Sequence, residues 1–127
     1  MHPIFILLLM FFCHIVDDYY LQGWLASAKQ KKWWKETAPR TLYRFDYIMA
    51  LVCHAFSWSF MIMLPIAFVT NWDMGWLFLA YPINMIIHAL VDDLKANKLA
   101  INLITDQCIH FVQIGFTFLA YYLIFLR

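Results

Sequence analysis

Four long apolar stretches limit what this chain of 127 residues can fold into. They cover roughly residues 3–25, 43–69, 74–96 and 101–126. A helix that crosses a bilayer needs about 20 mostly apolar residues, so each stretch is long enough. The chain is 65% hydrophobic, whereas soluble domains are roughly 45–50% apolar. We therefore predict an all-α membrane protein in which a single domain, residues 1–127, folds as a compact bundle of four transmembrane helices.

The basic residues predict how these helices are oriented. They gather in the first connection and near the third, and the second connection has none: Lys29, Lys31, Lys32, Lys35, Arg40 and Arg44 in the first, and Lys95 and Lys98 near the third. The positive-inside rule then places both connections in the cytoplasm and both termini outside, an N-out/C-out topology. The lipid bilayer is the expected partner. A formal net charge of +1 argues against nucleic-acid binding.

Ionisable side chains inside the apolar stretches are the second constraint. Every stretch supplies one histidine, and three also supply aspartate: His14, Asp17 and Asp18; His54; His88, Asp92 and Asp93; Asp106 and His110. A charged group near the centre of a membrane helix costs about 2.5–3.5 kcal/mol. Such groups are tolerated when they face a cavity and are paired or bound to a metal. The pattern therefore predicts a shared polar site.

Spacing indicates which of these groups share a face. Residues four apart on a helix lie on one face, and this spacing relates three sets: His14, Asp18 and Gln22; His88 and Asp92; Asp106 and His110. Asp17 and Asp93 fall off these faces, so we expect supporting partners, interfacial groups or helix-end residues there. At a rise of about 1.5 Å per residue, the site lies in the cytoplasmic half or near the midplane. The outer half of each helix is almost purely apolar.

Neutral imidazoles with carboxylates form a ligand set suited to a divalent metal, Zn²⁺ first, with Mn²⁺ or Fe²⁺ as alternatives. The predicted ligands are His14, His88, Asp92, His110 and His54. An unligated aspartate, Asp18 or Asp106, would act as base, and Lys95 would stabilise developing negative charge. Gln22 and Gln107 complete the polar site.

Purely structural roles remain possible alternatives for several of these residues. His54 has no carboxylate one turn away and could instead form a hydrogen bond between helices. Lys95 could extend to the lipid headgroups. We expect Ser57 and Ser59 to be packing or back-bonded hydroxyls, and the tryptophans to face lipid or the core.

The motifs HIVDDYYLQ at 14–22, HALVDDLK at 88–95 and TDQCIH at 105–110, with the isolated His54, resemble those of a small integral-membrane family. This family of bacteria and their phages is catalogued as domain of unknown function 3307. The resemblance covers nearly the whole chain, with the motifs in the same order. It implies a multi-pass protein of the bacterial inner membrane. Its pattern corresponds here to His14, Asp18, Gln22, His54, His88, Asp92, Lys95, Asp106, Gln107 and His110.

Three functions are compatible with this pattern. The first is a metal-dependent hydrolase that acts on an amphiphilic phosphoryl or acyl substrate at its cytoplasmic half. The second is a transporter or channel for metal ions or protons, because chains of Asp and His mark such pathways. The third is a non-catalytic phage or bacterial interaction module in which the polar groups only fix helix packing. A homo-oligomer is left open.

Overall fold

The computed structural model describes residues 2–127, in which helices are the regular secondary structure and strands are absent. A first helix, α1 (Pro3–Ile15), continues into a π-helical segment, η1 (Val16–Leu21). Short helices follow: α2 (Leu25–Ala28), α3 (Lys31–Thr37) and the 3₁₀ segment η2 (Thr41–Tyr43). Three long helices complete the chain: α4 (Asp46–Val69), α5 (Met74–Ala96) and α6 (Leu103–Phe125).

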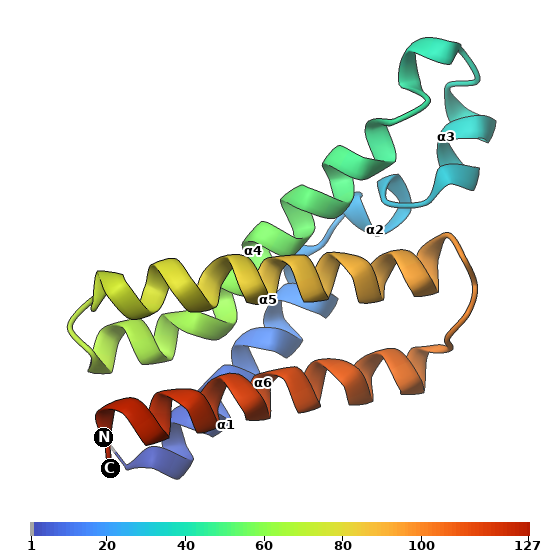
Figure 1. Ribbon diagram of the computed structural model, residues 1–127. Coiled ribbons are helices and arrows are strands. Elements are labelled where there is room, and N and C mark those ends of the chain that lie inside the picture. The colour runs from blue at the N-terminus through green and yellow to red at the C-terminus, as the bar shows by residue number, and fades with distance from the viewer. Residues whose placement is uncertain (1) are drawn as a thin grey trace.

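Four helical stretches within residues 2–127 are long and apolar enough to cross a membrane: Pro3–Leu21, Thr41–Val69, Met74–Ala96 and Leu103–Phe125. They pack as an up-and-down bundle. In Figure 1 both termini and the α4–α5 turn lie at one end, and the long first connection and the α5–α6 loop lie at the other. The predicted all-helical bundle of four apolar spans is confirmed, and its N-out/C-out orientation stays a prediction.

The first span is shorter than predicted, because its helix ends at Leu21 and not at residue 25. Gly23 follows with a φ of +53°, a left-handed conformation that glycine adopts without the steric cost of a Cβ. The chain then turns into α2, which sends the first connection across the end of the bundle toward α5. This turn decides which residues of that connection reach the site.

Side-chain caps begin the other helices where the sequence allows them. Asp73 Oδ1 accepts the backbone N–H of Trp76 at 2.8 Å, and Asn102 Oδ1 accepts that of Thr105 at 2.9 Å. Each cap satisfies a backbone donor that the first turn leaves free. Pro3 stands at the start of α1, where its missing N–H costs nothing.

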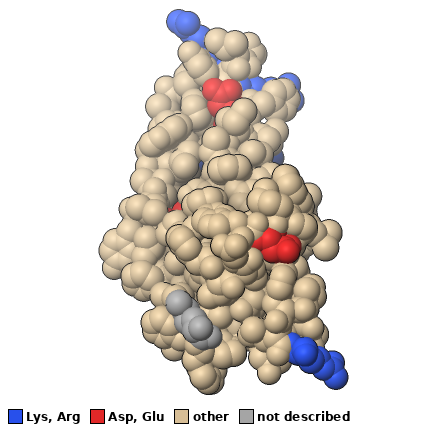
Figure 2. All heavy atoms as spheres, turned by 90° about the vertical axis from the view of Figure 1, so that its left-hand side faces the viewer, with Lys and Arg blue, Asp and Glu red and all other residues tan. Residues whose placement is uncertain are grey.

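Large apolar side chains cover the outside of the bundle as well as filling it. Phe5, Phe78 and Phe116 are all more than half exposed, as expected where lipid covers the surface. The end of the bundle that carries the termini shows few charged atoms, and basic atoms gather at its upper edge, at the height of α3 in Figure 1 (Figure 2). The charge distribution along the molecule is therefore that of a membrane-embedded bundle with one basic end.

The half of the bundle toward the termini, which is predicted from the sequence to be almost purely apolar, contains buried polar side chains. Asn84, Gln113 and Thr117 are buried there between α5 and α6. Asn84 Oδ1 accepts hydrogen bonds from Gln113 Nε2 at 2.9 Å and from Thr117 Oγ1 at 3.0 Å. These residues lie one and two turns outward from His88 and His110, so a polar strip continues beyond the predicted site.

Candidate metal centre

The bundle brings the predicted histidines and aspartates of all four spans into one buried cluster. None of their side chains is more than 7% exposed: His14, His54, His88, His110, Asp17, Asp18, Asp92 and Asp106. Below we call these eight residues the His/Asp cluster. Two sets within it have ligand atoms close enough to hold a metal ion: Asp18, His54 and His88; His88, Asp92 and His110. The prediction that these residues meet around one site is consistent with this geometry.

The first set converges on two imidazole nitrogens. His54 Nε2 lies 3.1 Å from Asp18 Oδ1 and 3.5 Å from Asp92 Oδ2. His88 Nε2 lies 4.0 Å from Asp18 Oδ1 and 3.9 Å from Asp92 Oδ2. Two ligand atoms of a tetrahedral Zn²⁺ are about 3.3 Å apart when each is about 2.0–2.1 Å from the metal. The two separations from His54 Nε2 match this value to about 0.2 Å, whereas the two from His88 Nε2 are about 0.6–0.7 Å longer.

The second set uses the other oxygen of Asp92. His110 Nε2 lies 3.6 Å from Asp92 Oδ1 and 3.5 Å from Asp106 Oδ1. Within residues 2–127, His88 Nε2, His110 Nε2 and Asp106 Oδ1 are buried without a hydrogen-bond partner. Native interiors rarely leave buried polar atoms unsatisfied. The two Nδ1 atoms of these rings lie 3.3 Å apart, so when both rings are neutral one Nδ1 donates to the other. The donor ring then presents an unprotonated Nε2, which is the form that a divalent metal takes.

The π-helical segment explains why neighbouring aspartates both face inward. Asp17 is 1% exposed, accepts a hydrogen bond from Ser57 Oγ, and has Oδ2 3.5 Å from His54 Nδ1. A π-turn inserts one residue into the helix, so Asp17 joins Asp18 on the inner side. Asp17 is thus a supporting partner of His54. Ser57 is not a packing or back-bonded hydroxyl, because its hydroxyl donates to a carboxylate.

His14 lies beside the two sets rather than in them. Trp58 Nε1–H donates to His14 Nδ1 at 2.8 Å, which leaves the ring proton of neutral His14 on Nε2. That nitrogen then donates to Gln107 Oε1 at 3.0 Å. Both ring nitrogens are engaged, so His14 orients other groups, whereas the sequence pattern made it a ligand.

Gln107 and Trp58, the two partners of His14, also contact other residues of the cluster. Gln107 Nε2 donates to Asp18 Oδ2 at 3.2 Å and to Asp106 Oδ2 at 3.0 Å. Trp58 also stacks on His88, with ring centroids 4.1 Å apart and planes 14° apart. From the sequence, Trp58 is expected only to face the core or the lipid. In the folded chain it holds the rings of His14 and His88 in place.

Two lysines reach the cluster from the end of the bundle that carries the first connection and the α5–α6 loop. Lys95 Nζ lies 2.6 Å from Asp106 Oδ2, so Lys95 pairs with an aspartate and does not extend to the headgroups. Lys29 Nζ lies 2.5 Å from Asp92 Oδ2, and Lys29 is only 4% exposed. The sequence does not single out Lys29, because it belongs to the basic connection. Lysines in such connections usually only set the orientation of the helices in the membrane.

Asn97 at the end of α5 fixes the segment that carries Lys29. Its amide donates to the Lys29 carbonyl at 3.0 Å and accepts the backbone N–H of Lys31 at 2.7 Å. Asp93, as expected for a residue off the shared face, accepts from Asn97 at 2.8 Å and pairs with Lys98 at 3.6 Å outside the cluster. No spacing rule within the apolar stretches connects Lys29 to Asp92.

The charges of the cluster do not balance. Four buried carboxylates face only two ammonium groups, so two negative charges remain when the histidines are neutral: Asp17, Asp18, Asp92 and Asp106 against Lys29 and Lys95. Uncompensated buried charge is strongly unfavourable. One divalent cation supplies the missing charge, and the free imidazole nitrogens mark where it would bind.

Two cavities lie beside residues that contact the cluster. A cavity of about 270 Å³ at the end of α5 is lined by Gln22, Lys29 and Lys95, and the Gln22 amide lies 2.9 Å from His54 Nε2. A second cavity of about 470 Å³ opens sideways between α1 and α6, with Tyr19 and Phe111 among its walls and Gln107 in its lining. The lining of the first cavity includes two lysines, and that of the second is mostly aromatic.

Comparison of the chain with protein-family models, with curated proteins and with solved structures finds no match. The resemblance to the domain of unknown function 3307 family therefore stays a prediction from the motifs.

Proposed function

We propose that this protein is a membrane-embedded, divalent-metal-dependent hydrolase. The observation that carries the proposal is that two buried imidazole nitrogens without a hydrogen-bond partner lie in the His/Asp cluster, where four carboxylates face only two ammonium groups. A neutral hydrogen-bonded network has neither feature. The ligands we assign are Asp18, His54, His88, Asp92 and His110, and Zn²⁺ fits this mixture of imidazole and carboxylate, with Mn²⁺ or Fe²⁺ as alternatives.

Other cluster residues have roles that follow from their contacts. When bound, a divalent cation supplies a Lewis acid for a phosphoryl or acyl oxygen and activates water for attack. Asp106 Oδ1 is buried and free to accept a proton, while Lys95 and Gln107 hold the other oxygen. We assign Asp106 as the general base. Lys95, which is 28% exposed beside the polar cavity, stabilises negative charge on the substrate.

The cavities favour an amphiphilic substrate. An apolar tail fits the lateral cavity between α1 and α6, which is open to lipid and ends at Gln107. An anionic phosphoryl or acyl head would then meet Lys95 and Lys29 at the polar cavity. We further propose membership of the bacterial and phage family named above, with a place in the inner membrane, on the strength of the motifs alone.

Elemental analysis combined with an ester assay tests the proposal. Protein purified without chelator should contain about one divalent metal per chain and hydrolyse a fluorogenic long-chain phosphate ester or the matching carboxylic ester. His88→Ala should lose metal and turnover together. His2→Ala is the matched control, because His2 caps α1 outside the cluster. Wild-type protein without metal, or with metal but no turnover on either ester, contradicts the proposal.

Transport of metal ions or protons is the second candidate, favoured by one observation. The polar strip of Asn84, Gln113 and Thr117 continues outward from His88 and His110, as a conducting path would. Liposome flux measurements decide between the candidates. Transport predicts flux that falls in His88→Ala and Gln113→Leu but not in His2→Ala. Wild-type flux equal to that of empty liposomes rejects it.

A further inference from the structure

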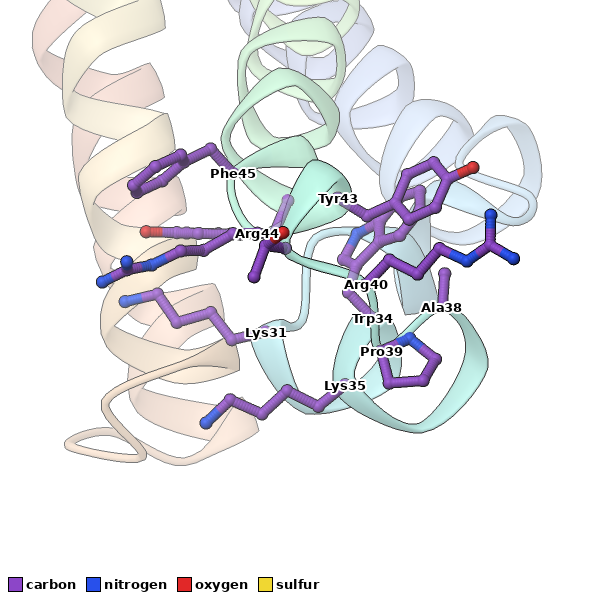
Figure 3. A pocket seen from close by; sticks show the side chains of 11 residues that line it. Lys31, Trp34, Lys35, Ala38, Pro39, Arg40, Tyr43, Arg44 and Phe45 are labelled. Atoms are coloured by element: carbon purple, nitrogen blue, oxygen red, sulfur yellow. The ribbon is translucent and has the colours of Figure 1, made fainter.

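A third, strongly basic cavity lies away from the His/Asp cluster, where the first connection meets the start of α4 (Figure 3). Its volume is about 440 Å³. Lys31, Lys35, Arg40 and Arg44 all line it. In Figure 3 the side chains of Lys31, Lys35 and Arg44 extend to one side of the segment, and Arg40 extends to the other. The cavity thus offers three cations to a single ligand.

These cations lack carboxylate partners in the described part of the chain. The ion pairs that lysines form within residues 2–127 involve other positions: Lys29, Lys32, Lys95 and Lys98. Even Glu36 pairs with Lys32, 3.7 Å away, and not with a residue of the cavity. Like charges gathered without counter-ions repel one another. An anionic ligand removes that repulsion.

Aromatic contacts give the cavity a fixed shape. Trp34 stacks on Tyr43, with centroids 6.1 Å apart and planes 15° apart, and Trp34 Nε1 donates to the Ala28 carbonyl at 2.6 Å. Lys31 Nζ lies 4.7 Å from the centroid of the Tyr47 ring. These side-chain contacts link α3 to the segment of residues 43–47, so the two walls of the cavity are held together by more than the backbone between them. Tryptophan and tyrosine with lysine and arginine are the combination found at the headgroup level of membranes.

We propose that this cavity binds the phosphate of an anionic phospholipid headgroup. The guanidinium of Arg44 can bind phosphate through two parallel hydrogen bonds, and Lys31 and Lys35 add point charges. The segments that line the cavity, α3 and the start of α4, lie at the same end of the bundle as the α5–α6 loop (Figure 1). Lipid headgroups would meet the ends of the spans there. A lipid also brings an apolar tail to the exposed Phe45 at the start of α4. Free phosphate shares the headgroup's chemistry but lacks that contact.

Native mass spectrometry from a neutral detergent tests the proposal. Wild-type protein is titrated separately with short-chain phosphatidylglycerol, short-chain phosphatidylcholine and inorganic phosphate. The test variant is the double substitution Lys31→Gln with Arg44→Gln. The matched control is Lys32→Gln with Lys98→Gln, which removes the same charge from paired lysines outside the cavity. Unfolding temperatures without lipid show that both variants are folded.

The wild type should bind one phosphatidylglycerol more tightly than phosphatidylcholine or inorganic phosphate. A basic residue at a membrane surface changes anionic-lipid affinity by about 5-fold, so the test variant should lose about 30-fold. The control should lose less than about 3-fold. Equal binding of both lipids, an equal loss in the control, or inorganic phosphate binding as tightly as phosphatidylglycerol would each overturn the proposal.

Discussion

Replacing Asp92 by asparagine tests the central contact of the His/Asp cluster. Asp92 is 2% exposed and faces Lys29 Nζ at 2.5 Å, His54 Nε2 at 3.5 Å and His110 Nε2 at 3.6 Å. Asparagine keeps the shape and removes the charge. The buried ammonium of Lys29 then loses its counter-ion, and breaking a buried pair in this way costs about 3–5 kcal/mol.

We expect the lower end of that range, about 3 kcal/mol, in the free energy of unfolding. Asp18 offsets part of the loss, because its carboxylate no longer faces a second one around His88 Nε2. Metal should be lost as well, because the variant lacks one ligand and the net negative charge of the cluster falls by one. Unfolding in micelles of constant composition and elemental analysis measure the two effects separately.

A second variant and a control make the result interpretable. Lys29→Met together with Asp92→Asn removes both charges, so at least about 2 kcal/mol of stability should return while metal stays absent. Asp93→Asn changes the neighbouring carboxylate, whose lysine partner is 59% exposed, and should cost at most about 1 kcal/mol with full metal content.

The outcomes divide the hypotheses clearly. Equal losses in Asp92→Asn and Asp93→Asn would refute the claim that the buried pair stabilises the fold. A double variant that regains both stability and stoichiometric metal would show that Asp92 is not a ligand. Recovery of stability in a protein whose wild type never carries metal would leave the cluster with a packing role only.

Three further predictions concern the metal, the turn and the tryptophan. A chelator should lower the unfolding free energy of the wild type by about 2.7 kcal/mol when the metal had been present at about 100 times its dissociation constant, and should not affect His88→Ala; thermal unfolding measures both. Gly23→Ala should lower the unfolding free energy by about 1–2 kcal/mol, because φ is +53°. The new Cβ meets no atom closer than 3.9 Å, so this backbone strain is the whole cost. Gly115→Ala, with open space around it inside α6, should be neutral or stabilising in the same unfolding assay. Trp58→Phe keeps the stack on His88 but leaves His14 Nδ1 without its donor, which should cost about 1–3 kcal/mol and leave metal content unchanged by elemental analysis.

Regular helices are the reason that much of the site was predictable. His88 with Asp92, and Asp106 with His110, lie on uninterrupted α-helices, so four-residue spacing places each pair on one face. The same rule was incomplete for the first span, where the π-helical segment turns Asp17 inward beside Asp18. A π-turn depends on the packing of neighbouring helices, which the hydropathy of a single stretch does not reveal.

Lys29 illustrates a second limit. Its position follows from the turn at Gly23 and from the hydrogen bonds that Asn97 makes to the connection. The turn is local, but these hydrogen bonds join segments 66 and 68 residues apart in sequence. A basic connection predicts orientation, but it does not identify the lysine that enters the bundle.

The bundle itself contains a comparison that bears on why the cluster is charged. Asn84, Gln113 and Thr117 link α5 to α6 through neutral hydrogen bonds. A neutral network of this kind therefore suffices to join these helices. The carboxylates of the cluster lie in the same bundle, and each charged group near a helix centre costs about 2.5–3.5 kcal/mol. Helix packing alone gives no reason for that cost, whereas a divalent cation binds to the charges and to the free imidazole nitrogens together.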